Sequence, residues 1–178
     1  MSDRKFQLKP FPTAKALPYL EIVTTVSRRD KLTVNYLLQG NLSQIILPPI
    51  KERVSRQDEL WQTTCFEFFL AVFHSRQYWE FNLAPTGDWN SYRFTDYRRR
   101  MTPSIAITAL PFEVTANNDS TYQITAQLDL KNIIAGNTPL EIAIATVIED
   151  TDGNLSYWAI THPGRQADFH RRDSFITI

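Results

Sequence analysis

The sequence predicts an all-β protein, an antiparallel β-sandwich with at most one or two short helices. In most segments apolar and polar residues alternate, and β-branched and aromatic residues are frequent. Ten prolines and several Asn/Asp clusters separate these segments, whereas glycine occurs five times. Many strands at regular spacing favour a sandwich or barrel over a parallel α/β sheet. We expect one domain over residues 1–178, a length that all-β domains reach undivided.

Strand segments follow one another along the chain. The alternating pattern predicts strands at Tyr19–Ser27, Lys31–Leu38, Thr64–Phe73, Tyr78–Ala84, Trp89–Phe94, Ile105–Ala116, Tyr122–Leu130, Leu140–Ile148, Leu155–Thr161 and, as a short last strand, Ser174–Ile178. Turns are predicted at Arg28–Asp30, Pro85–Asp88, Asn117–Ser120, Asn137–Pro139 and Asp150–Asn154. Within the last of these, Asp152-Gly153 is typical of a hairpin turn, because glycine adopts a positive φ without steric cost.

Two segments fit short helical structure. Asp129–Ala135 fits one helical turn, with Asp129 as its N-cap and Gly136 as its stop signal. Ile50–Leu60 is rich in charge and fits either a short helix or a long loop. Helices therefore contribute little to the predicted fold.

Two neighbouring strands carry polar residues in an otherwise apolar pattern. One face of each is entirely apolar: Phe66, Phe68, Leu70 and Val72 in the first strand, and Trp79, Phe81 and Leu83 in the second. The opposite faces are mixed: Cys65, Glu67, Phe69 and Ala71, then Tyr78, Glu80 and Asn82. The short His74–Gln77 link permits a hairpin. Such a hairpin would gather the polar atoms of Glu67, Glu80 and Asn82 on one sheet face.

Composition excludes several classes of protein. The net charge is zero, so the basic excess typical of a nucleic-acid partner is missing. Cys65 is the single cysteine, which excludes an intramolecular disulfide. No stretch of about 18 apolar residues occurs, so the sequence predicts no membrane span. The first twelve residues, MSDRKFQLKPFP, lack the apolar run of a secretory signal, so we expect a cytoplasmic location.

The four tryptophans are the first candidates for sugar binding, because the C–H face of a pyranose packs on a flat ring. Trp61 follows a charged stretch and precedes a strand, which makes it the best candidate, with Trp158 next. Trp89 follows a turn, and Trp79 alternates with core residues. The alternative for each is core packing, the commoner fate of tryptophan.

Glu67 is unusual in the middle of an apolar strand, where a carboxylate must be paired or face a solvent-filled site. It would either hydrogen-bond a ligand or form an ion pair with Arg93 or Arg98. Glu67 and Glu80 would also be the pair of carboxyls that a glycoside-acting enzyme needs. The sequence shows none of the common nucleophile, phosphate-binding or dinucleotide-binding motifs.

The histidines predict no metal site, because no ligand spacing connects them. If the protein held haem, its ligands would come from His74, His162, His170 and Met101. The basic and aromatic segment Tyr92–Met101 could stack on nucleic-acid bases. With no net charge elsewhere, a solvated loop with Arg–acid pairs is the favoured interpretation.

Three stretches together resemble the family 9 carbohydrate-binding modules and the related DOMON-like domains. DELW at 58–61 with TTCFEFFL at 63–70 is similar to the family's Asp and Trp before an E-x-F strand. YWEFNLAPTGDWN at 78–90 resembles its hairpin, and FHRRDSF at 169–175 resembles its closing stretch. The three motifs occur in the same order as in the family, and the match covers most of the chain. The sequence departs from the family where Arg172 replaces a frequent proline, where no glycine follows Phe175, and at Thr63-Thr64.

The resemblance implies a jelly-roll-like sandwich in which two tryptophans clasp a sugar end, while an acid and an arginine bond its hydroxyls. Trp61 then corresponds to the first tryptophan and Glu67 to the acid. Trp158 and Arg93 correspond to the second tryptophan and the arginine. DOMON-like relatives bind haem or sugars, which keeps haem as an alternative.

The sequence thus predicts a non-catalytic binding domain for a carbohydrate or similar small polar ligand, without metal or cofactor. The alternatives are a haem-binding domain, a glycoside-acting enzyme and an interaction scaffold without a ligand. We expect neither a nucleic-acid nor a membrane partner. The predicted ligand-binding residues are Trp61, Glu67, Glu80, Asn82, Trp89, Arg93 and Trp158.

Overall fold

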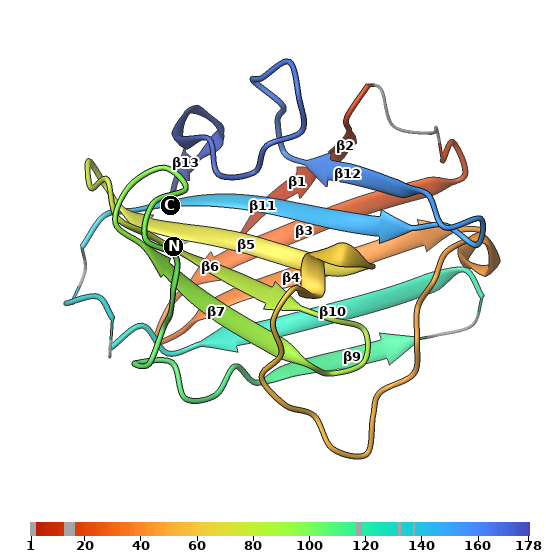
Figure 1. The fold of residues 1–178 in the computed structure, drawn as a ribbon, viewed down its shortest axis with the longest axis horizontal. Helices are drawn as coiled ribbons and strands as arrows, with labels where there is room; N and C mark the ends of the chain where they lie inside the picture. Colours follow the sequence, from red (N-terminus) through yellow and green to blue (C-terminus); the bar gives the residue numbers. More distant parts are fainter. Residues whose placement is uncertain (1–2, 13–16, 117–118, 132, 137) are drawn as a thin grey trace.

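Two antiparallel sheets pack face to face in the computed structural model, which describes residues 3–12, 17–116, 119–131, 133–136 and 138–178 (Figure 1). The first sheet has the strand order β1-β3-β4-β10-β9. Its strands are β1 Arg4–Gln7, β3 Leu20–Arg28, β4 Leu32–Gly40, β10 Thr121–Leu128 and β9 Phe112–Ala116. Every pairing between these strands is antiparallel. The sandwich class that alternation predicts is therefore confirmed.

The second sheet carries the features that matter for function. Its order is β2-β12-β11-β5-β6-β7-β8, and β13 also pairs with β11. Its strands are β2 Lys9–Pro10, β12 Leu155–Ala159, β11 Leu140–Glu149, β5 Cys65–Val72, β6 Tyr78–Leu83, β7 Trp89–Phe94, β8 Thr102–Pro103 and β13 Ile176–Thr177. Short 3-10 turns lie at η1 Leu42–Gln44, η2 Leu60–Gln62 and η3 Arg172–Ser174. No helix in the described part of the chain is long and apolar enough to cross a membrane.

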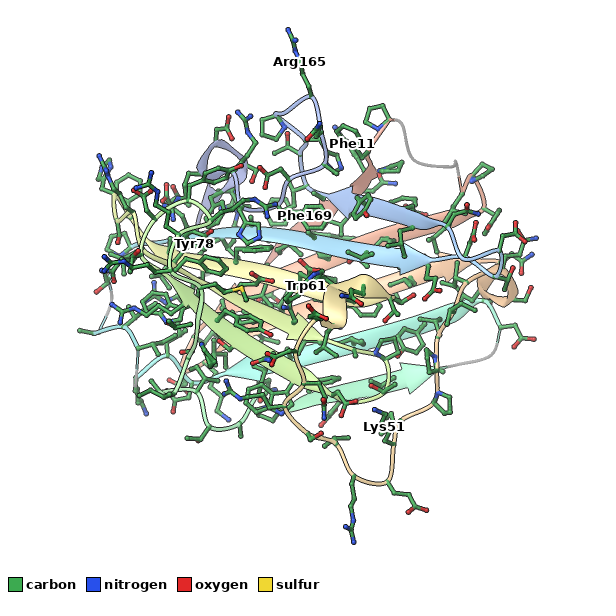
Figure 2. The ribbon with its side chains drawn as sticks, viewed as in Figure 1. Phe11, Lys51, Trp61, Tyr78, Arg165 and Phe169 are labelled. Atoms are coloured by element: carbon green, nitrogen blue, oxygen red, sulfur yellow. The ribbon has the colours of Figure 1, made fainter. Side chains whose placement is uncertain are left out.

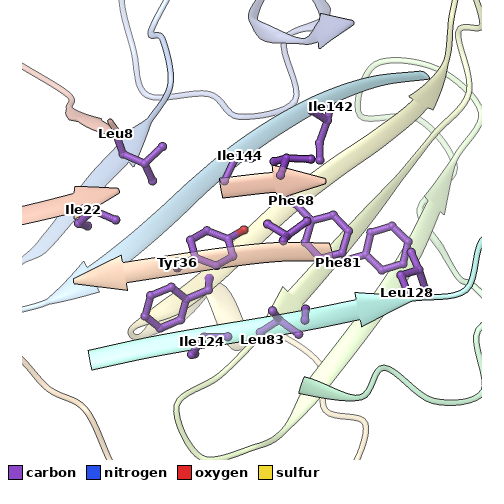
Figure 3. Packing of buried hydrophobic residues seen from close by; sticks show 14 of the residues in the cluster. Leu8, Ile22, Tyr36, Phe68, Phe81, Leu83, Ile124, Leu128, Ile142 and Ile144 are labelled. Carbon is purple, nitrogen blue, oxygen red and sulfur yellow. The ribbon is translucent and has the colours of Figure 1, made fainter. Parts of the chain in front are cut away.

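The main core lies between the two sheets, where the apolar faces meet (Figure 3). Phe68 of β5 and Phe81 of β6 stack with ring centroids 4.5 Å apart. From the first sheet, Tyr36 enters this core fully buried and donates its hydroxyl to the backbone oxygen of Glu67 (2.7 Å). Trp79 belongs to the same cluster, which confirms its predicted core position. With one face of β5 and β6 used for the core, their mixed faces point outward from the sandwich.

Most predicted strands lie within a few residues of their predicted bounds. The exception is Ile105–Ala116, which is a strand only from Phe112. Ile107 and Leu110 are buried from a loop, and Ile105 is 90% exposed, so these apolar residues follow no strand alternation. The short strands β1, β2 and β8 were not predicted, because they are largely exposed and carry no burial pattern.

The turn and helix predictions have a mixed outcome. Gly153 has a φ of 81° and closes the predicted hairpin turn. Ile50–Leu60 forms a loop that ends in η2, not a helix. In 129–135, Asp129 caps the amide of Lys131 (3.0 Å), but residue 132 lies outside the described ranges. Parts of the predicted turns Asn117–Ser120 and Asn137–Pro139 also lie outside them.

Candidate functional site

A cavity of about 340 Å³ lies on the outward face of the second sheet, and we call it the outer-face cavity. Its floor is formed by Glu67 of β5, Glu80 of β6 and Val147 of β11. Its rim residues include Trp61, Phe94, Arg98, Tyr157, Asp168, Phe169 and His170. Trp61 and Phe169 lie over the same part of the sheet in Figure 2. The volume falls in the range of small-molecule sites, about 300–1,000 Å³.

The floor holds two buried carboxyls on neighbouring strands. Glu67 pairs with Asn82, and Glu80 pairs with Phe69, so the two acids are diagonal neighbours on one face. Glu67 is 3% exposed and Glu80 is 4% exposed. Asn82 donates its side-chain amide to Glu80 Oε1 (2.9 Å), whereas the buried Glu67 Oε1 has no hydrogen-bond partner. The predicted gathering of these three polar residues is confirmed.

Burial perturbs the protonation of both acids. It raises the pKa of Glu67 well above its ordinary range; the neighbouring Glu80 adds to the rise, and Arg98 opposes it. Burial raises the pKa of Glu80 to about 7, against the hydrogen bond from Asn82 and the charge of Arg98. Like charges this close disfavour each other's ionisation, so the pair retains a proton near neutral pH.

A hydrogen-bond relay orients His170 beside Glu80. The backbone amide of Arg98 donates to the Tyr78 hydroxyl oxygen (3.1 Å), and that hydroxyl lies 2.8 Å from His170 Nδ1. The phenol proton then points at Nδ1, which places the ring proton on Nε2. His170 Nε2 lies 3.8 Å from Glu80 Oε2, beyond hydrogen-bond distance. Burial and then Arg98 lower the pKa of His170 to about 4, so the contact is not an ion pair at neutral pH.

A charged cluster forms one side of the rim. Asp168 accepts from Arg98 (2.9 Å) and from the Tyr97 hydroxyl (2.5 Å). Burial raises the pKa of Asp168, but the hydrogen bonds from Tyr97 and Arg98 outweigh it and bring the pKa below its ordinary value. Arg98 has a φ of 50°, a left-handed conformation that costs about 1–2 kcal/mol in a non-glycine residue. The turn at residues 95–100 therefore has a strained backbone at Arg98, the residue whose side chain lines the cavity.

Trp61 is a further part of the rim, and the preceding loop holds it in place. Its ring meets the Tyr92 ring edge-to-face, with centroids 5.8 Å apart. Tyr92 donates its hydroxyl to Asp58 (2.6 Å), and Asn90 donates to the backbone oxygen of Gln57 (2.7 Å). These β7 side chains fix the loop, while Trp61 itself is only partly buried. The ring is therefore preoriented and accessible, as a stacking surface has to be.

The predicted site residues divide into two groups. Trp61, Glu67 and Glu80 line the cavity, and Asn82 supports Glu80 from beside it. Trp89 does not reach the cavity. It is packed in the core between the sheets, and Arg56 lies over its ring at 4.5 Å.

Trp158 and Arg93 also lie elsewhere, because strand alternation sends them to the other face. Trp158 is 3% exposed in the core and donates its indole N–H to Ser156 (2.9 Å). Its neighbour Tyr157 lines the cavity instead. Arg93 is exposed and donates to Gln77 (2.7 Å), outside the cavity. Arg98 is the arginine that lines the outer-face cavity, and the sequence had offered it only as an ion-pair partner.

His170, Tyr157 and Phe169 were not among the predicted site residues. His170 and Phe169 belong to the closing FHRRDSF motif, which was a signal for this region. Tyr157 is adjacent to Trp158 on β12, so its outward position follows only once Trp158 is known to lie in the core. These residues complete the cavity from segments far from β5 in the sequence.

The cavity residues do not fit haem. Met101 and His170 both line the cavity, but His170 Nδ1 is bonded to the Tyr78 hydroxyl, so the remaining Nε2 carries the ring proton and has no lone pair for iron. His162 contacts the backbone oxygen of Lys9 (2.8 Å), and His74 packs on Phe73. Among the described residues, no group of three or more His, Cys, Asp or Glu side chains could hold a metal ion.

The geometry also disfavours glycoside hydrolysis. That chemistry needs one protonated carboxyl and one that stays ionised. Burial raises the pKa of Glu67 and of Glu80 alike, and neither is held ionised by a direct basic partner. The pair is better suited to bind donors than to act as an acid and a nucleophile.

No family model and no curated relative matches this chain. Solved structures do. A candidate carbohydrate-binding protein from Bacteroides uniformis has 10% identity and a TM-score of 0.68, over 97% of this chain and 85% of that one. A family 9 carbohydrate-binding module from Caldicellulosiruptor kristjanssonii, in complex with glucose, has 13% identity and a TM-score of 0.54, over 93% and 78%.

The chain has a fold like that of the family 9 carbohydrate-binding modules. The similarity extends over nearly the whole chain, which matches the order of the three motifs in the sequence. At this level of identity the likeness is one of fold. The function of this family 9-like sandwich therefore has to be argued from the cavity itself.

Proposed function

We propose that this family 9-like domain binds a carbohydrate, or a similar small polar ligand, in the outer-face cavity and does not catalyse a reaction. The observation that carries the proposal is the pairing of Trp61 with two buried carboxyls across one cavity. A sugar presents both an apolar C–H face and hydroxyl groups, so it matches both kinds of wall.

The polar groups would recognise a ligand in complementary ways. Glu67 Oε1 is an acceptor without a partner, which a ligand hydroxyl would satisfy. His170 directs its Nε2–H toward Glu80, which leaves a donor and an acceptor side by side at 3.8 Å. One ligand hydroxyl placed beside both atoms, on the cavity side, would accept from His170 and donate to Glu80.

The solved neighbours support the same proposal. The Caldicellulosiruptor module holds glucose, and the Bacteroides uniformis protein is described as a candidate carbohydrate-binding protein. We propose a carbohydrate ligand for the present chain as well, because its cavity is lined by both aromatic and acidic residues. The carboxyl pair retains a proton near neutrality, and burial raises the pKa of both acids, which supports binding without catalysis.

We also propose a cytoplasmic location and no nucleic-acid partner. The single cysteine, Cys65, is buried and free, which suits a reducing compartment. The zero net charge provides no basic field to attract a phosphate backbone.

The test is calorimetric titration and thermal unfolding of the full chain with mono- and oligosaccharides. A ligand at a hundred times its Kd stabilises by about 2.7 kcal/mol, a Tm rise of roughly 5–11 °C for a domain of this size. Trp61→Ala should remove the shift and keep the fold. Phe73→Ala, an exposed aromatic outside the cavity, is the matched control and should bind normally. Unchanged binding in folded Trp61→Ala, or no binding of any sugar to the wild type, contradicts the proposal.

A further inference from the structure

The outer-face cavity contains more acid than base. The charged or acidic groups that line it are Glu67, Glu80, Asp168 and Arg98. Arg98 is the sole guanidinium or ammonium among the described lining residues, and it is bonded to Asp168 at 2.9 Å. This ion pair leaves the carboxyls of Glu67 and Glu80 without a cation of their own.

The two carboxyls also have unused hydrogen-bonding capacity. Glu67 Oε1 is buried and has no partner. Glu80 uses Oε1 to accept from Asn82, and its Oε2 lies 3.8 Å from the nearest ring nitrogen of His170. A buried acid that lacks a donor costs free energy until a ligand supplies one. The diagonal register of β5 and β6 directs both acids at the same space.

The remaining walls suit an organic cation. Trp61, Phe94, Tyr157 and Phe169 line the cavity around the acids. Aromatic rings attract cations through their π faces, and this attraction grows when the site excludes water. Recognition of an ammonium group commonly combines such rings with carboxylates. Both elements are present here.

We propose that the preferred ligand of the outer-face cavity is a sugar with a free, protonated amino group, whose ammonium binds between Glu67 and Glu80 while its ring packs on Trp61. This inference rests on the proposed carbohydrate-binding function and specifies its ligand class. An ammonium supplies three donors and one positive charge, so it satisfies both acids at once. A hydroxyl supplies a single donor and no charge, and an acetylated amine loses the charge as well.

Proton release on binding follows from the same geometry. Several titratable or charged groups surround the acid pair. From the core side of the sheet comes Tyr36 of β4, and from the strands come Cys65 of β5, Tyr78 of β6 and Tyr92 of β7. The cavity side adds Arg98 from the 95–100 turn, and Asp168 and His170 from the C-terminal segment. None of these supplies an unpaired cation, so the acids retain a proton before the ligand binds. A bound ammonium favours the ionised carboxyls and displaces that proton. Affinity for the amino sugar should therefore rise with pH toward neutrality, as long as the amine itself stays protonated.

The experiment is calorimetric titration of the full chain with glucosamine, glucose, N-acetylglucosamine and glucuronate at about pH 6.5. We expect glucosamine to bind about tenfold tighter than glucose or more, and the acetylated and anionic sugars to bind more weakly than glucosamine. Repeating the glucosamine titration in buffers with different ionisation enthalpies should reveal release of a fraction of a proton. Glu67→Gln should reduce the affinity for glucosamine to about that for glucose, with circular dichroism as the check of its fold.

The outcomes separate this inference from the proposed function. If glucose binds as tightly as glucosamine to the wild type, the amino-sugar inference is overturned and carbohydrate binding stands. If no sugar of the series binds, both fail. The comparison among four sugars on the wild type decides the matter even where Glu67→Gln does not fold.

Discussion

Glu67 of β5 and Glu80 of β6 are diagonal neighbours on one sheet face, and both carboxyls are at least nine-tenths buried beneath the same cavity. Neither has a direct basic partner; Arg98 acts on both only through its charge. Two acids placed this way disfavour each other's ionisation. Their protonation therefore links folding, ligand binding and pH.

Glu80→Gln should remove much of a pH dependence of stability. The folded pKa of Glu80 is raised to about 7 from an ordinary 4.5, so its proton stabilises the folded state below pH 4.5. This stability is lost as the pH rises through 7, a difference on the order of 3 kcal/mol. We expect the free energy of unfolding of the wild type to fall between pH 5 and pH 8, measured by urea unfolding, and the variant to fall less.

Glu113→Gln is the matched control, because Glu113 is an exposed acid on the edge strand β9. It should keep the pH dependence of the wild type. The free energy of unfolding of Glu80→Gln could instead change with pH as steeply as that of the wild type and of Glu113→Gln. The Glu80 carboxyl would then not be protonated in the folded state, and the interpretation of the acid pair would be wrong.

Trp158→Phe should destabilise the protein and leave ligand binding intact. The indole is buried in the core and donates to Ser156 at 2.9 Å, so the change leaves a small void and removes a hydrogen bond. We expect a loss of about 2 kcal/mol in the free energy of unfolding. Sugar affinity, measured by calorimetry well below the Tm, should match that of the wild type. A large loss of affinity would instead favour the role that the sequence assigned to Trp158.

The fold could be predicted from the sequence because the alternation of apolar and polar residues is visible within each strand's own sequence. β5 and β6 each display one apolar face, and the short link between them permits an antiparallel hairpin, in which Glu67 lies opposite Asn82. The exposed strand β1 lacks this signal, and it forms because β3 offers a free edge. The segment before Phe112 was misleading, because Ile107 and Leu110 reach the core from a loop.

The site was only partly predictable, because its far wall comes from other parts of the chain. Trp61, Glu67 and Glu80 could be found from local pattern alone. Tyr157 was missed in favour of Trp158, although adjacent residues of a strand point to opposite faces. Which of two neighbours faces out depends on the β11–β12 pairing, a contact that neither strand's sequence specifies alone.

Gly40→Ala and Gly153→Ala should differ sharply in their effect on stability. Both glycines have a positive φ, of 131° and 81°. An added Cβ at Gly40 would lie 1.7 Å from the backbone oxygen of Tyr19, whereas nothing lies within 4 Å of one at Gly153. We expect Gly153→Ala to cost about 1–2 kcal/mol through backbone strain alone, and Gly40→Ala more than about 3 kcal/mol. Equal losses by denaturant unfolding would contradict the packing of the β3–β4 end.

His170 should occur as the Nε2–H tautomer and stay neutral down to about pH 4. The tautomer follows from Tyr78, whose oxygen accepts from the amide of Arg98 and whose proton is then directed at Nδ1. Burial, aided by Arg98, lowers the pKa of the ring to about 4, so the neutral form prevails above that pH. Nitrogen-15 NMR of the imidazole distinguishes the two tautomers by their chemical shifts and reports the titration midpoint.

Tyr78→Phe removes the hydroxyl and keeps the ring that stacks on Phe94 with centroids 4.7 Å apart. His170 Nδ1 and the amide of Arg98 both lose their partner, at a cost of about 1–3 kcal/mol in the free energy of unfolding. The Nε2–H preference should weaken in this variant, and the affinity for any ligand that accepts from Nε2–H should fall with it. A wild-type spectrum with the proton on Nδ1 would reverse the direction of the relay, and His170 would then present an acceptor to the cavity.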